Sequence, residues 1–407
     1  MKIVVVASIF APYKKGGAEV IAGTVVDLLR SKGHEVVVIT TDRWHGLASL
    51  WPQKNLESGG LVVYRWFPWN IFSYLDIDRR PWPFRVIWHV LDMVNLQGYF
   101  GVKAILRSER SDIVLTHGLK GLGYLIPVAI RSVGLSHVHT PHDIQLVVPS
   151  GLLLKGQEGQ LDYSWMRLYR WLTRHLFGSP SVVVFPSSFL QQWYRRWHFF
   201  PNSQQVVLNN PVIVSTALQG QHYSTSLTKF LYIGQLESHK GIGQLVEVFM
   251  GRQDDNWRLT IVGGGAALDD IKVQARKDAR ITIVGAVAHE AVAQYLVEAD
   301  FVVVPSLCYE NAPTVVVEAF SAGVPVVVAN IGGTAELVAD GVNGYIFEAD
   351  NSQSPAEALA RAAAGRGDWE RLSDRALKTV TSLSEECYYE SLERLMTKII
   401  ADRTKKP

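Results

Sequence analysis

The sequence has few cysteines and no long apolar run. Only Cys308 and Cys387 occur among 407 residues, which is too few for a disulfide framework and fits a reducing cytosol. No segment approaches about 18 uninterrupted apolar residues, so no membrane-spanning helix is expected. The apolar N-terminus is short, and the glycine turn and helix after it favour a first β-strand over a signal peptide. These absences argue against a disulfide-rich secreted protein and an integral membrane protein.

Charge and tryptophan are unevenly distributed along the chain. Residues 1–210 contain 22 Lys and Arg against 13 Asp and Glu, a net charge of +9, whereas the remainder contains 18 against 25, a net charge of −7. Ten of the twelve tryptophans also lie in residues 1–210. Since 48% of the residues are apolar, the chain is able to form two cores. The sequence therefore predicts two domains with different partners, 1–210 and 211–382, with a polar hinge at 215–228.

The N-terminal residues predict the start of a Rossmann-like domain. A strand at Lys2–Ala7 is followed by a glycine turn, a helix and a second strand at Val36–Thr40. Gly16 and Gly17 open the helix, where glycines let the backbone approach a ligand closely. An ordinary turn is the alternative interpretation of these two residues.

The next region, residues 44–110, is rich in aromatic residues and is expected to be irregular before one long helix that ends near Arg107. It contains Asp76-Ile77-Asp78, the D-x-D pattern with which GT-A transferases hold a metal. The pattern lacks the strand-end context that such a site needs, so a metal role is not favoured.

A second pattern, HVHTPHD, is compatible with a zinc site. His137 and His139 share one face of a predicted strand, and His142 follows it closely. No further ligand at a matching spacing is evident, and histidines packed in a strand are commoner. No metal or other cofactor is therefore expected.

The most informative stretch runs from Pro305 to Gly344. An apolar strand at Phe301–Val304 leads into a polar loop that carries Glu310. Asn311 is expected to cap the following helix and Pro313 to occupy its first turn. The helix carries Glu318 and is expected to end at Gly323, before a second buried strand.

This helix begins at the carboxyl end of a parallel strand, where open sheets bind ligands. Its first N–H groups carry a partial positive charge that suits a phosphate. Glu310 lies at the mouth of the crevice, and Glu318 lies about 7.5 Å further along, so each carboxylate is able to accept hydrogen bonds from hydroxyl groups. A sugar–diphosphate–ribose ligand fits this arrangement better than a bare phosphate, although two solvated surface acids are the alternative. The residues expected at the phosphate are Asn311, Ala312, Pro313, Thr314 and Val315.

The stretch resembles the retaining GT-B glycosyltransferases of family 4. These enzymes carry E-x7-E, then a small residue with Gly-x-Pro-Val, then Gly-Gly-x-x-Glu; the present chain has Glu310 and Glu318, Ala322–Val326 and Gly332–Glu336. The resemblance implies an α/β GT-B fold with two Rossmann-like domains that face a cleft, and a C-terminal helix at about 383–402 that crosses back to the first domain. It also implies a nucleotide-sugar donor on the second domain, an acceptor on the first, and transfer with retention.

Further site residues follow from the same resemblance. A Gly-Gly-x-Glu loop, here ending at Glu19, closes on the donor phosphates and the acceptor. A His-Asp pair, here His142 and Asp143, lies beside the transferred sugar. Gly264 and Val287 lie in turns that approach the phosphates and the base.

Lys240 follows another strand end and opens a helix, where it is expected to reach the diphosphate; an exposed lysine is the alternative. The family usually has an arginine at the position of Gln235, so a second cation for the diphosphate is missing and the donor-binding role of Gln235 is in doubt. Cys308 lies near Glu310, but no local histidine is evident to activate it, and a packing role is favoured.

These residues predict a glycosyltransferase in which Lys240, Glu310 and His142 act at the reacting sugar, and the helix N-terminus and Lys240 replace a metal at the leaving diphosphate. Two alternatives stay open: a nucleotide-sugar epimerase on the same fold, and a non-catalytic nucleotide-sugar-binding subunit.

The basic first half suggests where the acceptor lies. Its tryptophans cluster at 66–88, 165–171 and 193–197, and arginines alternate with aromatic residues in the last two clusters. This composition suits a membrane interface, which predicts peripheral docking on an anionic membrane at the inner face of the cell membrane, with a lipid-linked saccharide as acceptor in cell-surface polysaccharide synthesis. A surface for a soluble saccharide or an acidic partner is the alternative, and no nucleic acid is expected.

Overall fold

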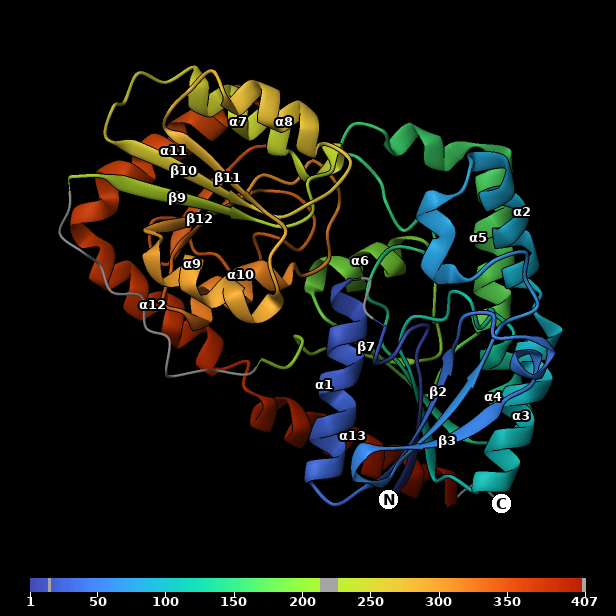
Figure 1. Cartoon of the computed structure of the whole chain (residues 1–407). Coiled ribbons are helices and arrows are strands. Elements are labelled where there is room, and N and C mark those ends of the chain that lie inside the picture. The colour runs from blue at the N-terminus through green and yellow to red at the C-terminus, as the bar shows by residue number, and fades with distance from the viewer. Residues whose placement is uncertain (14–15, 213–225, 405–407) are drawn as a thin grey trace. The chain divides into compact units, whose positions relative to one another are not determined.

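The computed structural model describes residues 1–13, 16–212 and 226–404 (Figure 1). Its contacts divide the chain into two units. The first contains Met1–Gly151, Gln160–Pro211 and the segment from Glu385 onward, and the second contains Leu152–Gly159 and Val212–Ser384. Most of the polar hinge expected at 215–228 lies outside the described residues.

The first unit is built on an eight-stranded sheet with the order β3-β4-β2-β1-β5-β6-β7-β8. All neighbouring strands are parallel except β3 and β4, which pair antiparallel at one edge. The central strands are runs of buried Val and Ile, as expected for a sheet covered on both faces. The strands are β1 (Lys2–Val6), β2 (Glu35–Thr41), β3 (Gln53–Glu57), β4 (Leu61–Trp66), β5 (Ile113–Thr116), β6 (Ser136–His139), β7 (Val182–Phe185) and β8 (Gln204–Val207).

Residues 44–110 differ from the sequence-based expectation. They contain β3 and β4, and the expected single helix is two, α2 (Trp82–Met93) and α3 (Leu96–Glu109). Asn95 separates the two helices because its side chain accepts a hydrogen bond from the backbone N–H of Gly98 at 2.9 Å, an N-cap for α3. The sequence QKNLE of β3 is mostly polar because this strand is an exposed edge, so it carried little strand signal.

The C-terminal helix α13 (Glu385–Thr404) belongs to the first unit. Its Tyr388, Leu392 and Met396 are buried in the same core cluster as the valines of β1 and β2. The remaining helices of this unit are α1 (Gly17–Ser31), α4 (Ile126–Val133), α5 (Ser164–Phe177) and α6 (Ser188–Arg196).

The second unit has a six-stranded parallel sheet with the order β11-β10-β9-β12-β13-β14. Its hydrophobic core contains aromatic residues such as Phe230, Phe249 and Phe301. The strands are β9 (Thr228–Ile233), β10 (Trp257–Val262), β11 (Ile281–Gly285), β12 (Phe301–Val304), β13 (Val326–Ala329) and β14 (Gly344–Phe347). The helices are α7 (Ile242–Met250), α8 (Leu268–Ala275), α9 (Val292–Glu298), α10 (Thr314–Ser321), α11 (Ser354–Ala364) and α12 (Trp369–Thr381).

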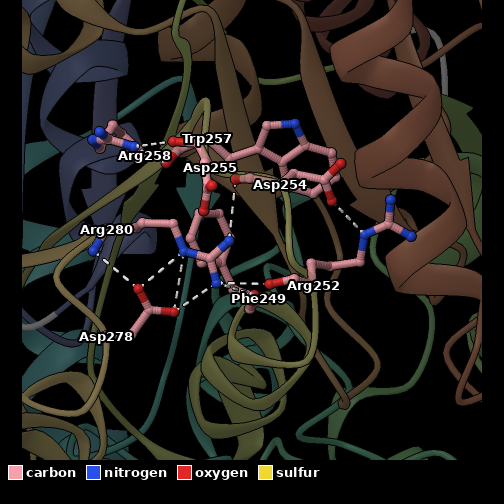
Figure 2. Close-up of polar contacts among 8 residues, drawn as sticks. All are labelled: Phe249, Arg252, Asp254, Asp255, Trp257, Arg258, Asp278 and Arg280. Atoms are coloured by element: carbon pink, nitrogen blue, oxygen red, sulfur yellow. Dashed lines mark hydrogen bonds and ion pairs between the residues drawn. The ribbon is translucent and has the colours of Figure 1, made fainter.

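Arg280 forms a cluster of contacts at the edge of the sheet where β10 and β11 begin (Figure 2). Its guanidinium pairs with Asp278 at 2.7 Å and donates to the carbonyl oxygens of Arg252 at 2.8 Å and Asp254 at 3.1 Å. It also lies 5.1 Å from the centre of the Phe249 ring. The hydrogen bonds from Arg280 hold the pKa of the Asp278 carboxyl below its usual value. This cluster is structural, because the ligand-binding edge of a parallel sheet is the opposite one.

Candidate active site

The strand order of the second unit reverses between β9 and β12, which are direct neighbours with Leu231 opposite Val302. Ligands of open α/β sheets bind beyond the carboxyl ends of the strands at such a reversal. The loop after β9 carries Gln235 and Lys240, and the loop after β12 carries Glu310. The topology therefore brings together two segments that are 70 residues apart in sequence.

Lys240 and Glu310 form an ion pair at this edge. The Nζ of Lys240 lies 2.9 Å from Oε1 of Glu310, and the hydroxyl of Ser306 donates to the same oxygen. The side chains retain 27% and 14% of their exposure, so water weakens this pair only in part. The arrangement places one cation and one anion where a charged ligand with hydroxyl groups is able to reach both.

Two glycines allow the loops to approach each other. Gly241 has φ +73°, and a Cβ there would lie 1.9 Å from the carbonyl oxygen of Pro305. Gly332 has φ +62°, and a Cβ there would lie 2.2 Å from the carbonyl oxygen of Glu310, which accepts a hydrogen bond from Gly333 N–H at 2.8 Å. Side chains at these positions would therefore displace the backbone that carries Glu310.

The helix after Glu310 starts later than the sequence suggested. Pro313 is the N-cap of α10, with φ −64° and ψ 124°, and Thr314 is its first helical residue. Asn311 is therefore not the cap, and it is a buried loop residue with Ala312 between it and the helix. The physical reason is that a proline restricts the residue before it to extended backbone, so no helical turn precedes Pro313.

The first N–H groups of α10 are those of Thr314 and Val315, and Glu318 lies half-buried in the middle of the helix. Gln235 is exposed, and its carbonyl oxygen accepts a hydrogen bond from the Tyr232 hydroxyl at 2.7 Å. Gly264 follows β10 and Val287 follows β11, so both lie at the same edge of the sheet as Gln235.

Cys308 does not suit nucleophilic chemistry. It has only 2% exposure, and its Sγ lies 4.0 Å from Oε1 of Glu310. Burial, with the nearby Glu310 carboxylate, raises the pKa of the Cys308 thiol to about 12. The thiol is therefore protonated near neutral pH, and its role is packing.

A short segment from the first half of the sequence, residues 152–159, belongs to the second unit and was not expected there. Leu154 forms an antiparallel bridge with Cys308, flanked by hydrogen bonds from Lys155 N–H to the Leu307 carbonyl at 3.0 Å and from Tyr309 N–H to the Leu153 carbonyl at 2.9 Å.

This segment also contacts the Glu310 loop through side chains. The hydroxyl of Tyr309 donates to Glu158 at 2.6 Å, and Lys155 pairs with Asp350 of the loop after β14 at 3.3 Å. The segment lines a cavity of about 470 Å³ with Leu307 and Ala349. The sequence did not predict this contact, because the three consecutive leucines at 152–154 give only a weak strand signal, and the pairing with residues 307–309 is not visible in the sequence.

The first unit has its own reversal of strand order, between β1 and β5. A cavity of about 40 Å³ lies at that place and is lined by Glu19, His117, His142 and Asp143, among others. This volume holds roughly one water molecule, so a sugar would bind at its mouth. Glu19 also accepts a hydrogen bond from the N–H of Gly16 at 2.9 Å and so closes the first turn of α1, beside the exposed Gly17.

His142 forms a pair with His117, a residue that sequence analysis did not single out. The His117 Nδ1 and His142 Nε2 atoms lie 2.9 Å apart, and the rings stack with centroids 5.2 Å apart. Burial lowers the pKa of His142 to about 4 and lowers that of His117 as well. Burial also raises the pKa of Asp143, which accepts a hydrogen bond from Gln145 N–H at 2.8 Å. The histidine pair is therefore neutral near pH 7, with a single shared proton between the facing nitrogens.

The other histidines of the HVHTPHD pattern do not converge with His142. His137 Nε2 and His139 Nδ1 both hydrogen-bond with the Thr116 hydroxyl, at 2.7 and 2.8 Å. Among residues 1–13, 16–212 and 226–404, no group of three His, Cys, Asp or Glu side chains is placed to hold a metal ion.

The expected membrane-facing role of Trp193 and Trp197 is wrong. Trp193 has 7% exposure, and Trp197 is half-buried with the Arg170 guanidinium 4.1 Å from its ring centre. Trp193 faces the interior because α6 packs against β7 and β8, and the indole nitrogen of Trp197 is also buried. The exposed aromatic residues lie elsewhere in this unit, at Trp82 and Trp165 for example.

Comparison with known proteins identifies the family and the fold of this chain. Residues 16–211 match the glycosyl transferase 4-like domain, and residues 220–379 match the glycosyl transferases group 1 domain. The chain belongs to this glycosyltransferase family. Its two parallel-sheet units have the predicted GT-B fold, as in sucrose-phosphate synthase from Thermosynechococcus elongatus, with a TM-score of 0.77 and 19% identity over 99% of this chain and 100% of that one. The Anabaena protein HepE in complex with UDP gives a TM-score of 0.72 and 17% identity over 98% and 100%.

Relatives in sequence come from polysaccharide synthesis. The putative teichuronic acid biosynthesis glycosyltransferase TuaC of Bacillus subtilis is 29% identical over 89% of each chain. A protein of the cps region of Klebsiella pneumoniae is 25% identical over 86% of this chain and 90% of that one. The UDP-Gal:alpha-D-GlcNAc-diphosphoundecaprenol alpha-1,3-galactosyltransferase of Escherichia coli is 24% identical over 71% and 76%. In the described part of this chain, no helix has the length and apolar character needed to cross a membrane.

Proposed function

We propose that this glycosyltransferase moves a hexose from a nucleotide sugar to a saccharide acceptor, with retention and without a metal. The observation that carries the proposal is the Lys240–Glu310 pair, 2.9 Å apart at the strand-order reversal of the second unit. It supplies one positive and one negative group at the position where a sugar diphosphate needs both. The complex of HepE with UDP supports a nucleotide ligand on this fold.

In this proposal, Lys240 and the N–H groups of Thr314 and Val315 meet the negative charge that develops on the leaving diphosphate. Glu310 accepts hydrogen bonds from sugar hydroxyls, and Ser306 and Lys240 hold its carboxylate in place. Glu318 accepts hydrogen bonds from the ribose. A well-placed donor at developing charge contributes about 100- to 1000-fold in rate, which supports a role for these groups in place of a metal ion.

We assign the acceptor to the first unit, with its hydroxyl near the cavity of His142, Asp143 and Glu19. The neutral His142–His117 pair is suited to accept a hydrogen bond from a hydroxyl group without attracting the diphosphate. The named roles of TuaC and the diphosphoundecaprenol galactosyltransferase support a lipid-linked saccharide and cell-surface polysaccharide synthesis. Such an acceptor places the protein in the cytoplasm at the inner face of the cell membrane.

The test is mass spectrometry of the purified protein with a panel of nucleotide sugars and a lipid-linked saccharide. Transfer adds one sugar mass to the acceptor and releases the nucleoside diphosphate. An isomerised donor without transfer would instead identify an epimerase. Binding without any turnover would identify a nucleotide-sugar-binding subunit, an outcome to consider because Gln235 stands where the family usually has an arginine. The anomeric configuration of the product, measured by NMR, decides retention.

A further inference from the structure

Helix α2 has an unusual surface. Ten of its twelve side chains are exposed or half-buried, and only Trp88 and Asp92 are buried. The exposed apolar residues reach 71% exposure at Trp82 and 58% at Val90. They are Trp82, Phe84, Val86, Ile87, Val90 and Leu91. An exposed apolar set of this size on one element marks a contact surface rather than ordinary surface variation.

These residues lie on one continuous face. Successive helical residues are turned by about 100°, so the arc from Trp82 through Val90 and Ile87 to Phe84 covers about 200° of the helix. That arc contains no charged side chain, because Arg85 falls outside it at about 300°, and His89 at about 340° borders it next to Trp82. The exposed face is therefore uniformly apolar, which is the reverse of the usual surface helix.

The opposite face fixes the helix in this orientation. The Asp92 carboxylate accepts a hydrogen bond from Gly121 N–H at 2.9 Å. Trp88 donates from Nε1 to the Phe72 carbonyl at 2.9 Å and stacks on Tyr74 with ring centroids 5.6 Å apart. Because these anchors are buried, α2 is not able to turn its apolar arc inward without breaking them.

Helix α5 is connected to α2 through the loop at residues 121–124, and Figure 1 shows both helices in the first unit. Both helices contact the same loop: Gly121 bonds Asp92 of α2, and the hydroxyl of Tyr124 lies 3.5 Å from that of Tyr169 in α5. The outer side of α5 also carries exposed apolar residues, Trp165, Leu168 and Trp171.

Cations border the apolar residues. Arg79 and Arg80 immediately precede α2 and are exposed, Arg85 lies beside the arc, and Arg167 is exposed between Trp165 and Leu168. An apolar surface bordered by arginines is complementary to a bilayer with anionic headgroups, where rings and aliphatic chains enter the acyl boundary and guanidinium groups meet phosphates. At about 18 Å, a twelve-residue helix is too short to span a bilayer of roughly 30 Å, so it would lie in the interface.

We propose that the apolar arc of α2, with the exposed residues of α5, inserts into the interface of an anionic phospholipid bilayer. This inference rests on the proposed function, because a lipid-linked acceptor is the reason for the protein to stay at the membrane. It replaces Trp193 and Trp197, which are unsuited to this role, with residues that face solvent.

The test is co-sedimentation of the full chain with vesicles of phosphatidylcholine, alone or with phosphatidylglycerol. The protein is expected to bind the anionic vesicles, and Phe84→Ser with Ile87→Ser is expected to reduce the partition coefficient at least about tenfold. Leu47→Ser with Leu56→Ser removes two apolar side chains from other elements that are more exposed than Phe84 and Ile87, and it is expected to leave binding unchanged. Thermal unfolding of each variant verifies that its fold is retained.

Arg79→Ser with Arg80→Ser is expected to remove most of the preference for anionic vesicles. Equal binding by the α2 variant and the wild-type protein, or no binding by either, would overturn the proposal. Loss of a dimer in the α2 variant, seen by light scattering, together with no vesicle binding, would overturn it in favour of a second copy as the occupant. The assay needs no nucleotide sugar, so it can fail while sugar transfer to a soluble acceptor stands, and transfer can fail while the vesicle result stands.

Discussion

The two units of this protein have their candidate sites at the same topological position, but one site contains charged side chains and the other contains buried side chains whose charged forms are disfavoured. In the second unit, the reversal of strand order holds a charged pair, Lys240 and Glu310. In the first, it holds His117 and His142, whose pKa values burial lowers, and Asp143, whose pKa burial raises. One site is thus built of charges and the other of groups driven toward neutrality. The contrast teaches that a shared fold positions a ligand, whereas the residues after each strand decide which chemical groups the site is suited to bind.

The largest effect should come from breaking the charged site. Glu310→Gln removes the anion that Lys240 and Ser306 hold, so the sugar loses its strongest hydrogen-bond acceptor. We expect kcat to fall at least about 100-fold while the nucleoside diphosphate still binds. Steady-state kinetics and calorimetry check the two halves separately. Near-normal kcat would show that Glu310 is not at the reacting sugar.

The backbone of the charged site is tested by a pair of glycine substitutions. Gly241→Ala puts a Cβ 1.9 Å from the Pro305 carbonyl and requires φ +73°, so the free energy of unfolding should fall by about 2 kcal/mol or more. Gly243→Ala, two residues along in α7, meets nothing within 4 Å and should raise that free energy by about 0.5–1 kcal/mol. Urea unfolding measures both. An equal effect of the two substitutions would refute the close approach of the loops.

The neutral site should make stability depend on pH. Burial lowers the pKa of His142 to about 4 and of His137 to about 3, and those of His117 and His139 also lie below the usual value. The unfolded state therefore binds more protons as the pH falls below about 6.5, and the free energy of unfolding should decrease until the pH passes the folded values.

Burial raises the pKa of Asp92 to about 7 and also that of Asp143, which opposes this trend because the folded state then retains protons. Burial lowers the pKa of His89 to about 4 as well, so more histidines than aspartates have shifted pKa values, and we expect a net loss of stability between about pH 6.5 and 5.5. Urea unfolding at these pH values measures the loss. A constant or rising stability over that interval would show that the histidines are not kept neutral.

A smaller effect distinguishes ribose binding from surface charge in the second unit. Glu318→Ala should weaken nucleoside diphosphate binding by about 1–3 kcal/mol, because charged hydrogen bonds to the ribose are lost. Glu357→Ala, an exposed glutamate in the first turn of α11, is the matched control and should change nothing. Calorimetric titration compares them. The same affinity in both variants would remove Glu318 from the ribose site.

The smallest expected effect is a gain in affinity for the nucleoside diphosphate. Gln235 is exposed at the edge of the sheet, so Gln235→Arg adds a cation where the family usually has one. Binding of the diphosphate should tighten about tenfold. A loss of activity with no gain in affinity would give Gln235 a different role in the site.

Much of the second unit could be predicted from its sequence. Buried runs such as Phe301–Val304 and the turn residues after them define strands and turns locally, and Glu310 and Lys240 lie in such turns. The predicted start of α10 was wrong because both Asn311 and Pro313 are common at helix N-termini. The backbone is extended at Pro313, so the helix begins after it.

The first unit was less predictable because its signals are non-local. The edge strand β3 is polar, and only its pairing with β4 defines it. The partner of His142 is His117, which lies 25 residues away on another strand end. The tryptophan clusters indicated an exposed aromatic surface in this unit. Which tryptophans are exposed could not be predicted, because the burial of Trp193 and the exposure of Trp82 depend on tertiary packing.

The central claim is that the charged site of the second unit holds the diphosphate of the donor, and titration of Lys240→Ala tests it most directly. The probe is whichever nucleoside diphosphate of a panel binds the wild-type protein most tightly in calorimetry. We predict that its Kd rises at least about tenfold in Lys240→Ala, because the side chain that meets the phosphates is gone. An unchanged Kd in a folded Lys240→Ala variant would contradict the claim and place the diphosphate elsewhere.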